Sequence, residues 1–443
     1  MSEQETSLQD FVGREDPNDE NHIIGFGSFP GDWSKQPLEE CAKIRDSERI
    51  PLNRSEREAK KPGDIPYYGA NGVVDYINEY IFDSELVLLA EDGGHFDEYQ
   101  QRPVAYRISG KAWVNNHAHI LEARDGIATD YLFYSLEHRN LVPYVAGSTR
   151  SKLTQTMLKR VSLPVPPLEE QHKIASVLFA IDEAIQKTEE IIEQIKTIRQ
   201  GLRQDFFTFG VNESGELRSF DQTKETYLGP VPENWNLLRI DDICSHVVDC
   251  PHSTPDYAEE GIIVVRTSEI ENGKFDPTDA PRVTEEGYRE RISRLEPIPG
   301  DVIFTREAPI GEAFKIPEGM KLCLGQRIVQ LRPKDDTLNP DFLVELLYSD
   351  MMQSWFERSA RGTTSKHINV EDIENMKIPI PPLDEQQRID SVLGTYRNNI
   401  ETEQEYLSTL KFLKQGLMQD LLSGTVRTTD TNIEVLPEIE QHG

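Results

Sequence analysis

Cysteine is scarce in this chain of 443 residues, and long apolar runs are absent. The four cysteines, Cys41, Cys244, Cys250 and Cys323, are scattered, which argues against a disulfide framework and for a reducing compartment. No uninterrupted apolar run reaches the ~18 residues that a membrane span needs. The N-terminus, MSEQETSLQD, has neither the basic nor the apolar region of a signal peptide. We therefore expect a water-soluble, cytoplasmic protein.

The motifs of common catalytic sites are also missing. The sequence has no GxxxxGKS/T loop, no GxGxxG after a strand and no HExxH. His117 and His119 are zinc-like residue types, but they alternate in an apolar segment, which favours one face of a strand. Cys244, Cys250 and His252 lack a second ligand pair at zinc spacing. We expect no catalytic residue, no metal and no cofactor in this chain.

Basic residues are few relative to acidic ones. Lys and Arg number 47 against 78 Asp and Glu, so the formal net charge is −31. Such an excess of acid fits a protein that is solvated in concentrated salt, or one that binds a basic partner. It argues on its face against nucleic acid, because phosphate contacts need Lys and Arg. Net charge sets solubility rather than the chemistry of a site, however, so its local distribution matters more.

What the sequence does contain is one stretch that occurs twice. LPVPPLEEQHKIASVL at 163–178 matches IPIPPLDEQQRIDSVL at 378–393, 215 residues later. The correspondence holds without a gap from Gly147 to Thr208 in the first copy. An internal repeat of this size predicts two versions of one structural unit.

Each copy begins a long helix. Pro-Pro precedes each start, and acidic residues that include Glu170 and Glu385 fill the first turn, where the helix dipole stabilises negative charge. Each helix would have ~40 residues and a length of ~60 Å, and Gly210 and Gly424 lie near the expected ends. Apolar residues recur in two interleaved heptad lines, the pattern of a coiled-coil seam. The predicted seam comprises Ile174, Leu178, Ile181, Ile185, Ile192, Ile195, Leu202, Ile389, Leu393, Tyr396, Ile400, Leu407, Leu410 and Leu417.

Two such helices could pair with each other, or each could cap its own domain. A helix of this length cannot bury one continuous stripe on a small domain, which favours mutual pairing. The connections allow either orientation, and an antiparallel pair would place the two domains at opposite ends.

The remaining sequence predicts two mixed α+β domains. Strand-like segments with alternating β-branched and aromatic residues begin at Ile65 and Gly261, and a short amphipathic helix follows in each half. The predicted organisation is an acidic, mostly disordered leader at 1–30, a domain at 31–163, a spacer helix at 164–210, a linker at 211–228, a second domain at 229–379, a second spacer helix at 380–424 and a tail at 425–443.

Basic side chains gather at equivalent places in the two halves. Residues 138–168 and 358–370 contain Lys and Arg but no acid, and each stretch includes a Gly-Ser/Thr-Thr turn. Turn amides, hydroxyls and basic side chains are the groups that make phosphate contacts, although a surface loop that is merely basic is the plainer alternative. The candidates for such contacts are Ser148, Thr149, Arg150, Lys152, Arg361, Thr363, Thr364, Lys366 and His367.

The doubled Pro-Pro-Leu-Glu/Asp-Glu-Gln segment lies after a Gly-Ser/Thr-Thr turn and before a heptad helix in both copies. In this arrangement the chain, from about Gly31 to about Gly424, closely resembles the specificity subunit of type I restriction–modification systems. The resemblance implies two target-recognition domains and two spacer helices packed as an antiparallel coiled coil with pseudo-twofold symmetry. Each domain would read one half of a bipartite, asymmetric site in double-stranded DNA, and the coiled coil would set the gap between the halves.

The resemblance also implies partners. Two methyltransferase subunits would modify adenine with S-adenosylmethionine, and two motor-nuclease subunits would join for cleavage, with ATP and Mg²⁺ on these partners. The specificity subunit itself would carry no catalytic residue. Side chains with hydrogen-bonding groups suited to base edges are the candidate readers. They are Asn116 and His119 in the first domain and Arg266, Arg306, Gln326 and Arg327 in the second.

Two other classes of function remain as alternatives. A stand-alone DNA methyltransferase or nuclease would need an Asn/Asp-Pro-Pro-Tyr/Phe segment or a metal-binding carboxylate set, whereas Leu follows each Pro-Pro pair here. An acidic coiled-coil scaffold or DNA mimic would explain the net charge but not the basic turns. The target sequence depends on loop geometry, which residue propensities do not supply.

Overall fold

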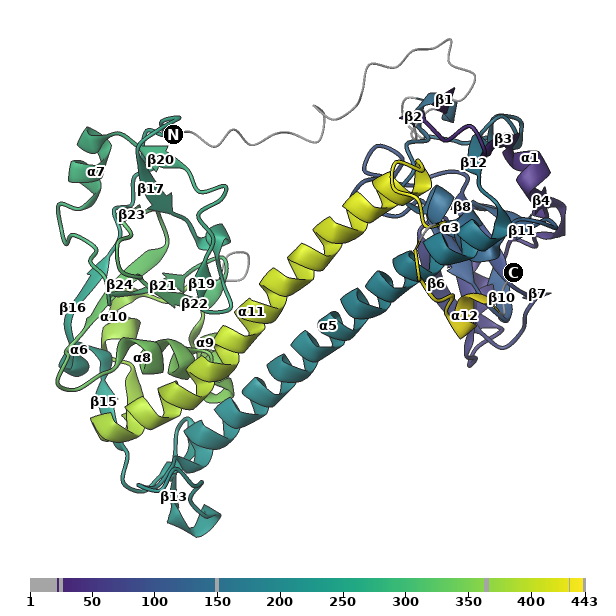
Figure 1. Ribbon diagram of the computed structural model, residues 1–443. Coiled ribbons are helices and arrows are strands. Elements are labelled where there is room, and N and C mark those ends of the chain that lie inside the picture. The colour runs from purple at the N-terminus through teal and green to yellow at the C-terminus, as the bar shows by residue number, and fades with distance from the viewer. Residues whose placement is uncertain (1–21, 24–26, 148–150, 362–365, 430, 441–443) are drawn as a thin grey trace. The chain divides into compact units, whose positions relative to one another are not determined.

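Figure 1 shows the computed structural model of the chain, which describes all residues except 1–21, 24–26, 148–150, 362–365, 430 and 441–443. The chain divides into two compact units, and we call residues 1–189 with 406–443 unit 1 and residues 190–405 unit 2. Each unit therefore takes part of both long helices, α5 (Leu168–Phe209) and α11 (Leu383–Leu422).

Unit 1 contains an α+β domain built on two four-stranded sheets. One is antiparallel in the order β4-β11-β8-β9, and the other has the order β6-β5-β10-β7 with β5 and β10 parallel. Every residue of β8 is buried, which explains its uninterrupted apolar sequence LVLLA. The elements are β1 (His22–Ile23), β2 (Gly27–Ser28), β3 (Ser34–Pro37), α1 (Leu38–Cys41), β4 (Ala42–Ile44), α2 (Arg54–Glu58), β5 (Ile65–Gly69), β6 (Gly72–Ile77), β7 (Phe82–Asp83), β8 (Leu86–Ala90), β9 (Ala105–Ile108), β10 (Lys111–Val114), β11 (Ala118–Ala123), α3 (Thr129–Glu137), α4 (Gln155–Leu158), β12 (Ser162–Val165) and α12 (Pro437–Glu440).

Unit 2 contains a second α+β domain. Its antiparallel sheet has the order β16-β24-β21-β22, and its second sheet, β20-β17-β23, has a parallel pair of β17 with β23. The elements are β13 (Thr223–Thr226), β14 (Gly229–Pro232), β15 (Asn236–Arg239), α6 (Ile240–Ile243), β16 (Cys244–Asp249), β17 (Ile262–Val265), β18 (Ile270–Glu271), β19 (Lys274–Phe275), β20 (Arg282–Val283), α7 (Glu285–Arg291), β21 (Val302–Arg306), β22 (Ile310–Lys315), β23 (Leu322–Leu324), β24 (Ile328–Pro333), α8 (Pro340–Leu347), α9 (Asp350–Ser359), α10 (Val370–Glu374) and β25 (Lys377–Ile380).

The two domains share one plan, as the repeat predicts. The sheet β4-β11-β8-β9 corresponds to β16-β24-β21-β22 in strand order. The strand before each long helix pairs antiparallel with a strand near the start of its domain, β12 with β3 and β25 with β15. The predicted α+β class and the doubled unit are therefore confirmed.

The long helices pack against each other in opposite directions within each unit. In unit 1, Lys411 of α11 pairs with Glu189 of α5 at 2.7 Å, and Lys414 pairs with Asp182 at 2.7 Å. The residue number thus rises along one helix as it falls along the other. In unit 2, Leu202, Phe206 and Phe207 from the last turns of α5 share one core with Ile389 and Leu393 from the first turns of α11, as an antiparallel pair requires.

The predicted seam residues are buried or half-buried on these helices. Ile174, Leu178, Ile389 and Leu393 are fully buried, while Leu202 and Leu417 pack partly buried against the cores of their units. Five apolar residues of these helices outside the seam are exposed: Ile191, Ile198, Tyr406, Phe412 and Leu413. Heptad periodicity therefore identified the packed face of both helices.

Some predicted boundaries need correction. The Pro-rich segments at 164 and 380 belong to strands β12 and β25, so the helices begin a few residues later, at Leu168 and Leu383. Much of the predicted leader lies outside the described residues, but its last part forms the β1–β2 pair, and Phe29 is buried, so folded structure begins before Gly31. The predicted linker at 211–228 includes β13, which pairs with β14.

Candidate nucleic-acid interface

In unit 1 a buried carboxylate joins the domain to the start of its spacer helix. Glu170 accepts hydrogen bonds from the indole N–H of Trp33 at 3.1 Å and from the Arg427 guanidinium at 2.8 Å. Arg427, which follows the end of α11, also donates to Asp32 at 2.7 Å. These hydrogen bonds to Glu170 and Asp32 raise the pKa of Arg427.

Unit 2 repeats this arrangement with Glu385. The carboxylate accepts from the indole N–H of Trp235 at 3.0 Å and from Arg218, which follows the end of α5, at 2.8 Å. Burial alone would raise the pKa of Glu385, but Arg218 and Trp235 hold it below its ordinary value. The helix-dipole explanation of these glutamates was therefore incomplete, because each one also pairs with the guanidinium of an arginine that follows the other long helix.

The glutamine after each carboxylate ties the helix to the domain. Gln171 accepts a hydrogen bond from the backbone N–H of Ala128 at 2.9 Å and donates to the carbonyls of Gly126 and Pro166 at 3.0 and 2.9 Å. Gln386 makes the same set of one accepted and two donated bonds in unit 2. An amide is needed because the site uses a donor and an acceptor together. The repeated Glu-Gln pair thus fixes where each domain meets its helix.

The first basic turn lies beside the carboxyl end of β8. Lys152 forms backbone bridges with Ala146 and Asp92, and the Leu153 N–H donates to the carbonyl of Glu91 at 2.7 Å. The Lys152 ammonium pairs with the Glu91 carboxylate at 3.0 Å and stays 47% exposed. Lys152, a predicted phosphate contact, is therefore accessible to solvent while it pairs with Glu91.

The second basic turn takes the equivalent place beside β21. Arg361 and His367 form a backbone bridge, and His367 also bridges to Glu307, which directly follows the strand. The Arg361 guanidinium is 62% exposed and pairs with Asp372 at 3.0 Å. Lys366 is exposed. The remaining predicted contacts in the two turns lie outside the described residues: Ser148, Thr149, Arg150, Thr363 and Thr364.

Two candidate base readers of unit 2 meet at this turn. The backbone N–H of Arg306 donates to the carbonyl of Arg327 at 3.0 Å, and the Arg306 carbonyl accepts from Ile368 at 3.0 Å. The Arg306 side chain is held by Asp249 at 3.2 Å. Arg327 has a left-handed backbone with φ of 67°, and its side chain is 50% exposed and 3.7 Å from Glu307. A non-glycine residue in this conformation costs about 1 kcal/mol or more, which marks Arg327 as a candidate functional position.

The other two candidate readers of unit 2, Arg266 and Gln326, follow the carboxyl ends of the parallel strands β17 and β23. The Gly325 N–H donates to the Val265 carbonyl at 2.8 Å, which brings Gln326 close to Arg266. Gln326 is half-buried and donates to the carbonyl of His252 at 2.5 Å. The Arg266 guanidinium pairs with a carboxylate, Glu269, and remains 42% exposed. The structure therefore places Arg306 and Arg327 at the second basic turn. It places Arg266 and Gln326 together at the carboxyl ends of β17 and β23.

In unit 1 one candidate reader is wrongly placed. His119 is 1% exposed, with Nδ1 2.6 Å from Asp46 and Nε2 2.7 Å from the Leu153 carbonyl. Each ring nitrogen lies within hydrogen-bond distance of one of these oxygens, so neither is free to contact a base. The alternation that put His119 on a strand was right, but it did not show which face is buried. His119 instead anchors the residue next to Lys152.

Asn116, the other candidate in unit 1, is exposed. Its neighbour His117 pairs with Asp92 at 2.5 Å, and Asn71 donates to the carbonyl of Gly93 at 3.0 Å. Polar side chains from two turns thus meet at the end of β8. Asn-Gly is a turn signal in any sequence, but it predicts a turn at Asn71-Gly72 and not a site residue.

Arg291 is a residue that the sequence did not point to. It is 5% exposed and donates to the carbonyls of Leu324 and Gly325 at 2.6 and 2.8 Å and to that of Ser253 at 2.6 Å. The Arg291 guanidinium therefore fixes the residues just before Gln326. It also fixes the segment around Ser253, to which Gln326 donates. No local pattern distinguishes this arginine from Arg289, the exposed arginine of the same helix.

One group of side chains has the composition of a metal site. Oxygen and nitrogen atoms of Asp46, Glu91 and His119 lie within 4.8 Å of one another. The Arg49 guanidinium lies 2.5 Å from Glu91, and Lys152 pairs with the same carboxylate, so cationic side chains already neutralise the cluster. The arrangement is explained as a charge network below the first basic turn.

The cysteines of the predicted metal alternative are buried thiols. Burial raises the pKa of Cys244 to about 12, and it also raises the pKa of Cys250. Neither is in a disulfide. No described helix has the length and apolar character that crossing a membrane requires.

The comparisons with known proteins agree with this geometry. The family model described as "Type I restriction modification DNA specificity domain" matches residues 30–197 and 232–411. The type I restriction enzyme MjaVIII specificity subunit of Methanocaldococcus jannaschii is 26% identical over 363 residues, which cover 80% of this chain and 82% of that protein. The EcoDI specificity subunit of Escherichia coli is 23% identical, with 90% of each chain covered.

A solved structure has the same fold. The S subunit of a type I restriction–modification system from M. genitalium superimposes with a TM-score of 0.57 at 12% identity, over 90% of this chain and 99% of that one. The family model matches most of the chain as two copies, on the two domains with their spacer helices. The chain therefore belongs to the family of type I restriction–modification DNA specificity subunits.

Proposed function

We propose that this chain is the non-catalytic DNA-recognition subunit of a type I restriction–modification complex. The domain of unit 1 reads one half of a bipartite, asymmetric site in double-stranded DNA, and the domain of unit 2 reads the other. One observation carries the proposal. Basic and polar side chains gather at equivalent places, beside β8 and beside β21, in a chain whose net charge is −31.

Two equivalent places with different side chains suit two half-sites of different sequence. Unit 1 offers Asn116, His117 and Lys152 there, whereas unit 2 offers Arg306 and Arg327. Amides read adenine edges best and guanidinium groups read guanine edges best. An asymmetric target follows from this difference.

The acidic partners of these basic side chains favour specificity over affinity. Of the predicted phosphate contacts, Arg361 is held by Asp372 and Lys152 is held by Glu91. A phosphate must displace a carboxylate that is already in place, so contacts to the DNA backbone gain little free energy. Base contacts and the partner subunits then supply a larger share of the binding free energy.

The spacer helices have two roles in the proposal. Their length sets the gap between the half-sites, and two methyltransferase subunits dock on them. Apolar side chains off the seam support the docking role, since Phe412 is 71% exposed and Leu413 49% exposed on α11. The methyltransferase subunits carry S-adenosylmethionine, and two motor-nuclease subunits carry ATP and Mg²⁺.

Adenine methylation tests the proposal. The chain purified with its methyltransferase partner is expected to methylate one bipartite DNA sequence, and the chain alone to methylate none. Sequencing of modified adenine in the host genome and in plasmid DNA treated in vitro should return the same site. Methyl transfer by the isolated chain, or methylation by the complex without sequence preference, would contradict the proposal.

A further inference from the structure

The parallel strand pairs of the two domains end in the same way. In unit 2 the N–H of Gly325, just after β23, donates to the carbonyl of Val265, the last residue of β17, at 2.8 Å. In unit 1 the N–H of Asn115, just after β10, donates to the carbonyl of Tyr68 on β5 at 3.0 Å. The two hydrogen bonds have the same place in the register of their strand pairs. Residues that follow these positions in one unit therefore have structural equivalents in the other.

The equivalent positions carry different side chains. Arg266 and Gln326, two candidate base readers of unit 2, correspond to Gly69 and Asn116 of unit 1. Asn116 retains the amide of Gln326. Gly69 has no side chain, so unit 1 lacks the guanidinium that Arg266 supplies in unit 2.

The side chain of Val74 fills the space beside Gly69. A Cβ atom on Gly69 would lie 2.9 Å from Cγ2 of Val74 and 3.4 Å from Nδ2 of Asn115. Val74 is nevertheless 61% exposed. An accessible apolar side chain thus occupies in unit 1 the place where the Arg266 side chain begins in unit 2.

A β-bulge brings Val74 to this place. Tyr67 of β5 lies opposite Asp75 of β6, and the next residue, Tyr68, lies opposite Val73. Val74 is therefore the extra residue of the bulge, and a bulge changes the direction of side chains at this point of a strand. Val73 and Val74 are consequently both exposed, although they are adjacent in the strand.

Protection of the sheet edge does not explain these two valines. β6 is the edge strand of its sheet, and a bulge at an edge hinders pairing with another chain. Edges that are protected in this way carry charged side chains, whereas exposed valines add apolar surface. The valines therefore indicate contact with an apolar group of a ligand.

The hairpin that carries Val74 is connected to the first basic turn. Asn71, in the turn between β5 and β6, donates to the carbonyl of Gly93 at 3.0 Å. The Gly93 N–H in turn donates to the carbonyl of Ser151, which precedes Lys152, at 3.4 Å. The exposed valine thus adjoins the candidate nucleic-acid interface of unit 1.

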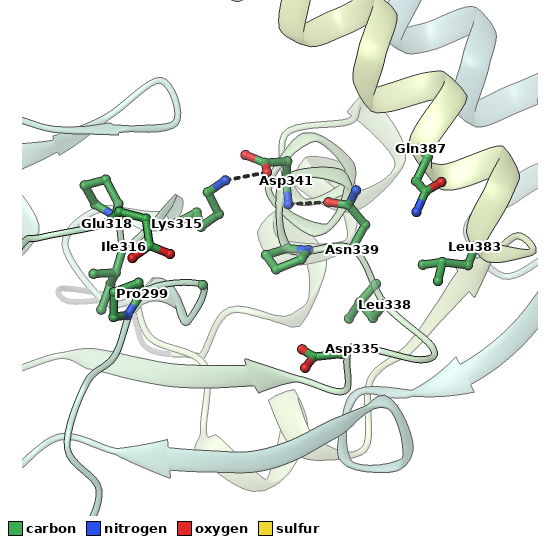
Figure 2. Close-up of a pocket in the computed structure, with 13 residues that line it drawn as sticks. Pro299, Lys315, Ile316, Glu318, Asp335, Leu338, Asn339, Asp341, Leu383 and Gln387 are labelled. Carbon is green, nitrogen blue, oxygen red and sulfur yellow. Dashed lines mark hydrogen bonds and ion pairs between the residues drawn. The ribbon is translucent and has the colours of Figure 1, made fainter.

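A cavity of about 470 Å³ in unit 2 offers no comparable contact with DNA. Figure 2 shows that its lysine, Lys315, is paired with Asp341, and that Glu318 and Asp335 also line it. These carboxylates would repel phosphate groups. Contacts with bases are therefore expected at the strand ends and not in this cavity.

We propose that Val74 makes an apolar contact with the C5-methyl group of a thymine in the half-site that unit 1 reads. The major groove of DNA admits a two-stranded β-ribbon, and thymine is the only one of the four bases with a methyl group there. Arg266, at the equivalent position of unit 2, has the guanidinium that reads guanine best. The two units thus select different bases at equivalent positions. This contact rests on the proposed function.

Replacement of thymine by deoxyuridine tests the contact, because it removes the C5-methyl group and nothing else. The complex of the full chain with its methyltransferase subunit is titrated with duplexes that contain its methylation site. Each thymine of the site is replaced in turn, and fluorescence anisotropy measures the affinity. One replacement should weaken binding by the wild-type complex about fourfold, the effect of one buried methyl group.

Val74→Ala should bind the unmodified duplex at least about fourfold more weakly than the wild-type chain. It should not respond to deoxyuridine at the thymine that the wild-type chain detects, because the contact is already lost. Val426→Ala is the matched control, since Val426 is 48% exposed and follows α11. The control should keep the wild-type affinity and the wild-type response to deoxyuridine.

The thymine contact is overturned if no single replacement weakens binding by the wild-type complex, or if Val74→Ala retains the full response. Sequence-specific methylation together with either result would leave the proposed function intact. A complex that methylates no specific sequence would instead refute the proposed function and, with it, the thymine contact.

Discussion

Two acidic side chains near the start of α11, Glu385 and Asp390, have pKa values shifted in opposite directions, because different groups surround them. Glu385 is buried against Arg218 and Trp235, and its pKa lies below the ordinary value despite burial. Burial raises the pKa of Asp390 to about 6, and the neighbouring Asp341 adds to the shift. The same functional group therefore stabilises the fold at one position and destabilises it at the other.

Replacement of Glu385 by Gln should lower the free energy of unfolding of the full chain by about 2–4 kcal/mol at neutral pH, because it removes the buried carboxylate that accepts from Arg218 and Trp235. Urea unfolding measures the change, and Asp384→Asn, whose side chain is 64% exposed, is the matched control. The folded-state pKa of Glu385 lies below the unfolded value of about 4.5, so its contribution is present above pH 4.5 and is lost as pH falls through the folded-state pKa. Equal stability of both variants at neutral pH would contradict this.

Asp390→Asn should have the opposite effect. The folded-state pKa of about 6 lies above the unfolded value of 3.8, so the charged form costs stability above pH 6 and costs nothing below 3.8. The variant should be more stable than the wild-type chain by about 1–2 kcal/mol at pH 7.5, after allowance for solvent screening. The gain should fade between pH 6 and 4 in urea unfolding. A variant that is less stable at pH 7.5 would show that Asp390 is held as a charged partner.

At the scale of elements, the segment that follows each long helix makes an ion pair with the first turn of the other long helix. Gly210 and Gly424 end α5 and α11 with left-handed backbones, φ of 63° and 72°, as the sequence predicts. The arginine after each glycine then returns to the glutamate at the start of the other helix. In each unit an ion pair therefore links the end of one long helix to the start of the other. The heptad pattern does not predict these ion pairs.

The short helix α12 contributes one buried anchor to unit 1. Ile439→Ala should lower the free energy of unfolding by about 2–4 kcal/mol, since it leaves a cavity around a fully buried side chain. Val426→Ala in the same segment removes a side chain that is 48% exposed and should cost less than about 0.5 kcal/mol. Chemical unfolding of both full-length variants compares them. Loss of stability by Val426→Ala alone would show that the C-terminal segment is held differently.

Helix length should set the spacing of the DNA target. Deletion of residues 188–194 and 403–409 removes one heptad at matching repeat positions and shortens each helix by ~10 Å. The gap between half-sites should shrink by about three base pairs, while the half-site sequences remain the same, because both domains are untouched. Sequencing of adenine methylation by the variant complex reads both properties. An unchanged gap would refute the spacing role of the helices.

On the scale of the whole molecule, acidity opposes both the fold and DNA binding. Self-repulsion from a net charge of −31 destabilises the compact state, and salt screens it. Carboxylates are also plentiful inside the candidate interface, where they pair with Arg306, Arg361 and Lys152. A protein of this composition is suited to concentrated salt, in which the Debye length falls to ~3 Å at 1 M.

The melting temperature of the chain should therefore rise as KCl increases from 0.1 to 1 M, by about 2–4 °C for each kcal/mol of stability gained. Scanning calorimetry measures it, and an equal series with glycerol controls for a non-ionic effect. DNA affinity should fall over the same range, because salt weakens phosphate contacts. A melting temperature that falls with KCl would exclude self-repulsion as the dominant electrostatic effect.

Features with a period along the chain could be derived from the sequence alone. The repeat predicted two α+β domains and two long helices, and the heptads predicted that Ile174 and Ile389 are buried, because both patterns are set by local geometry. Antiparallel packing of the helices rested on the family resemblance. Contacts between distant residues were decided only by the tertiary structure. Burial of His119 and pairing of Glu385 with Arg218 depend on which segments meet in space, and no local pattern encodes that.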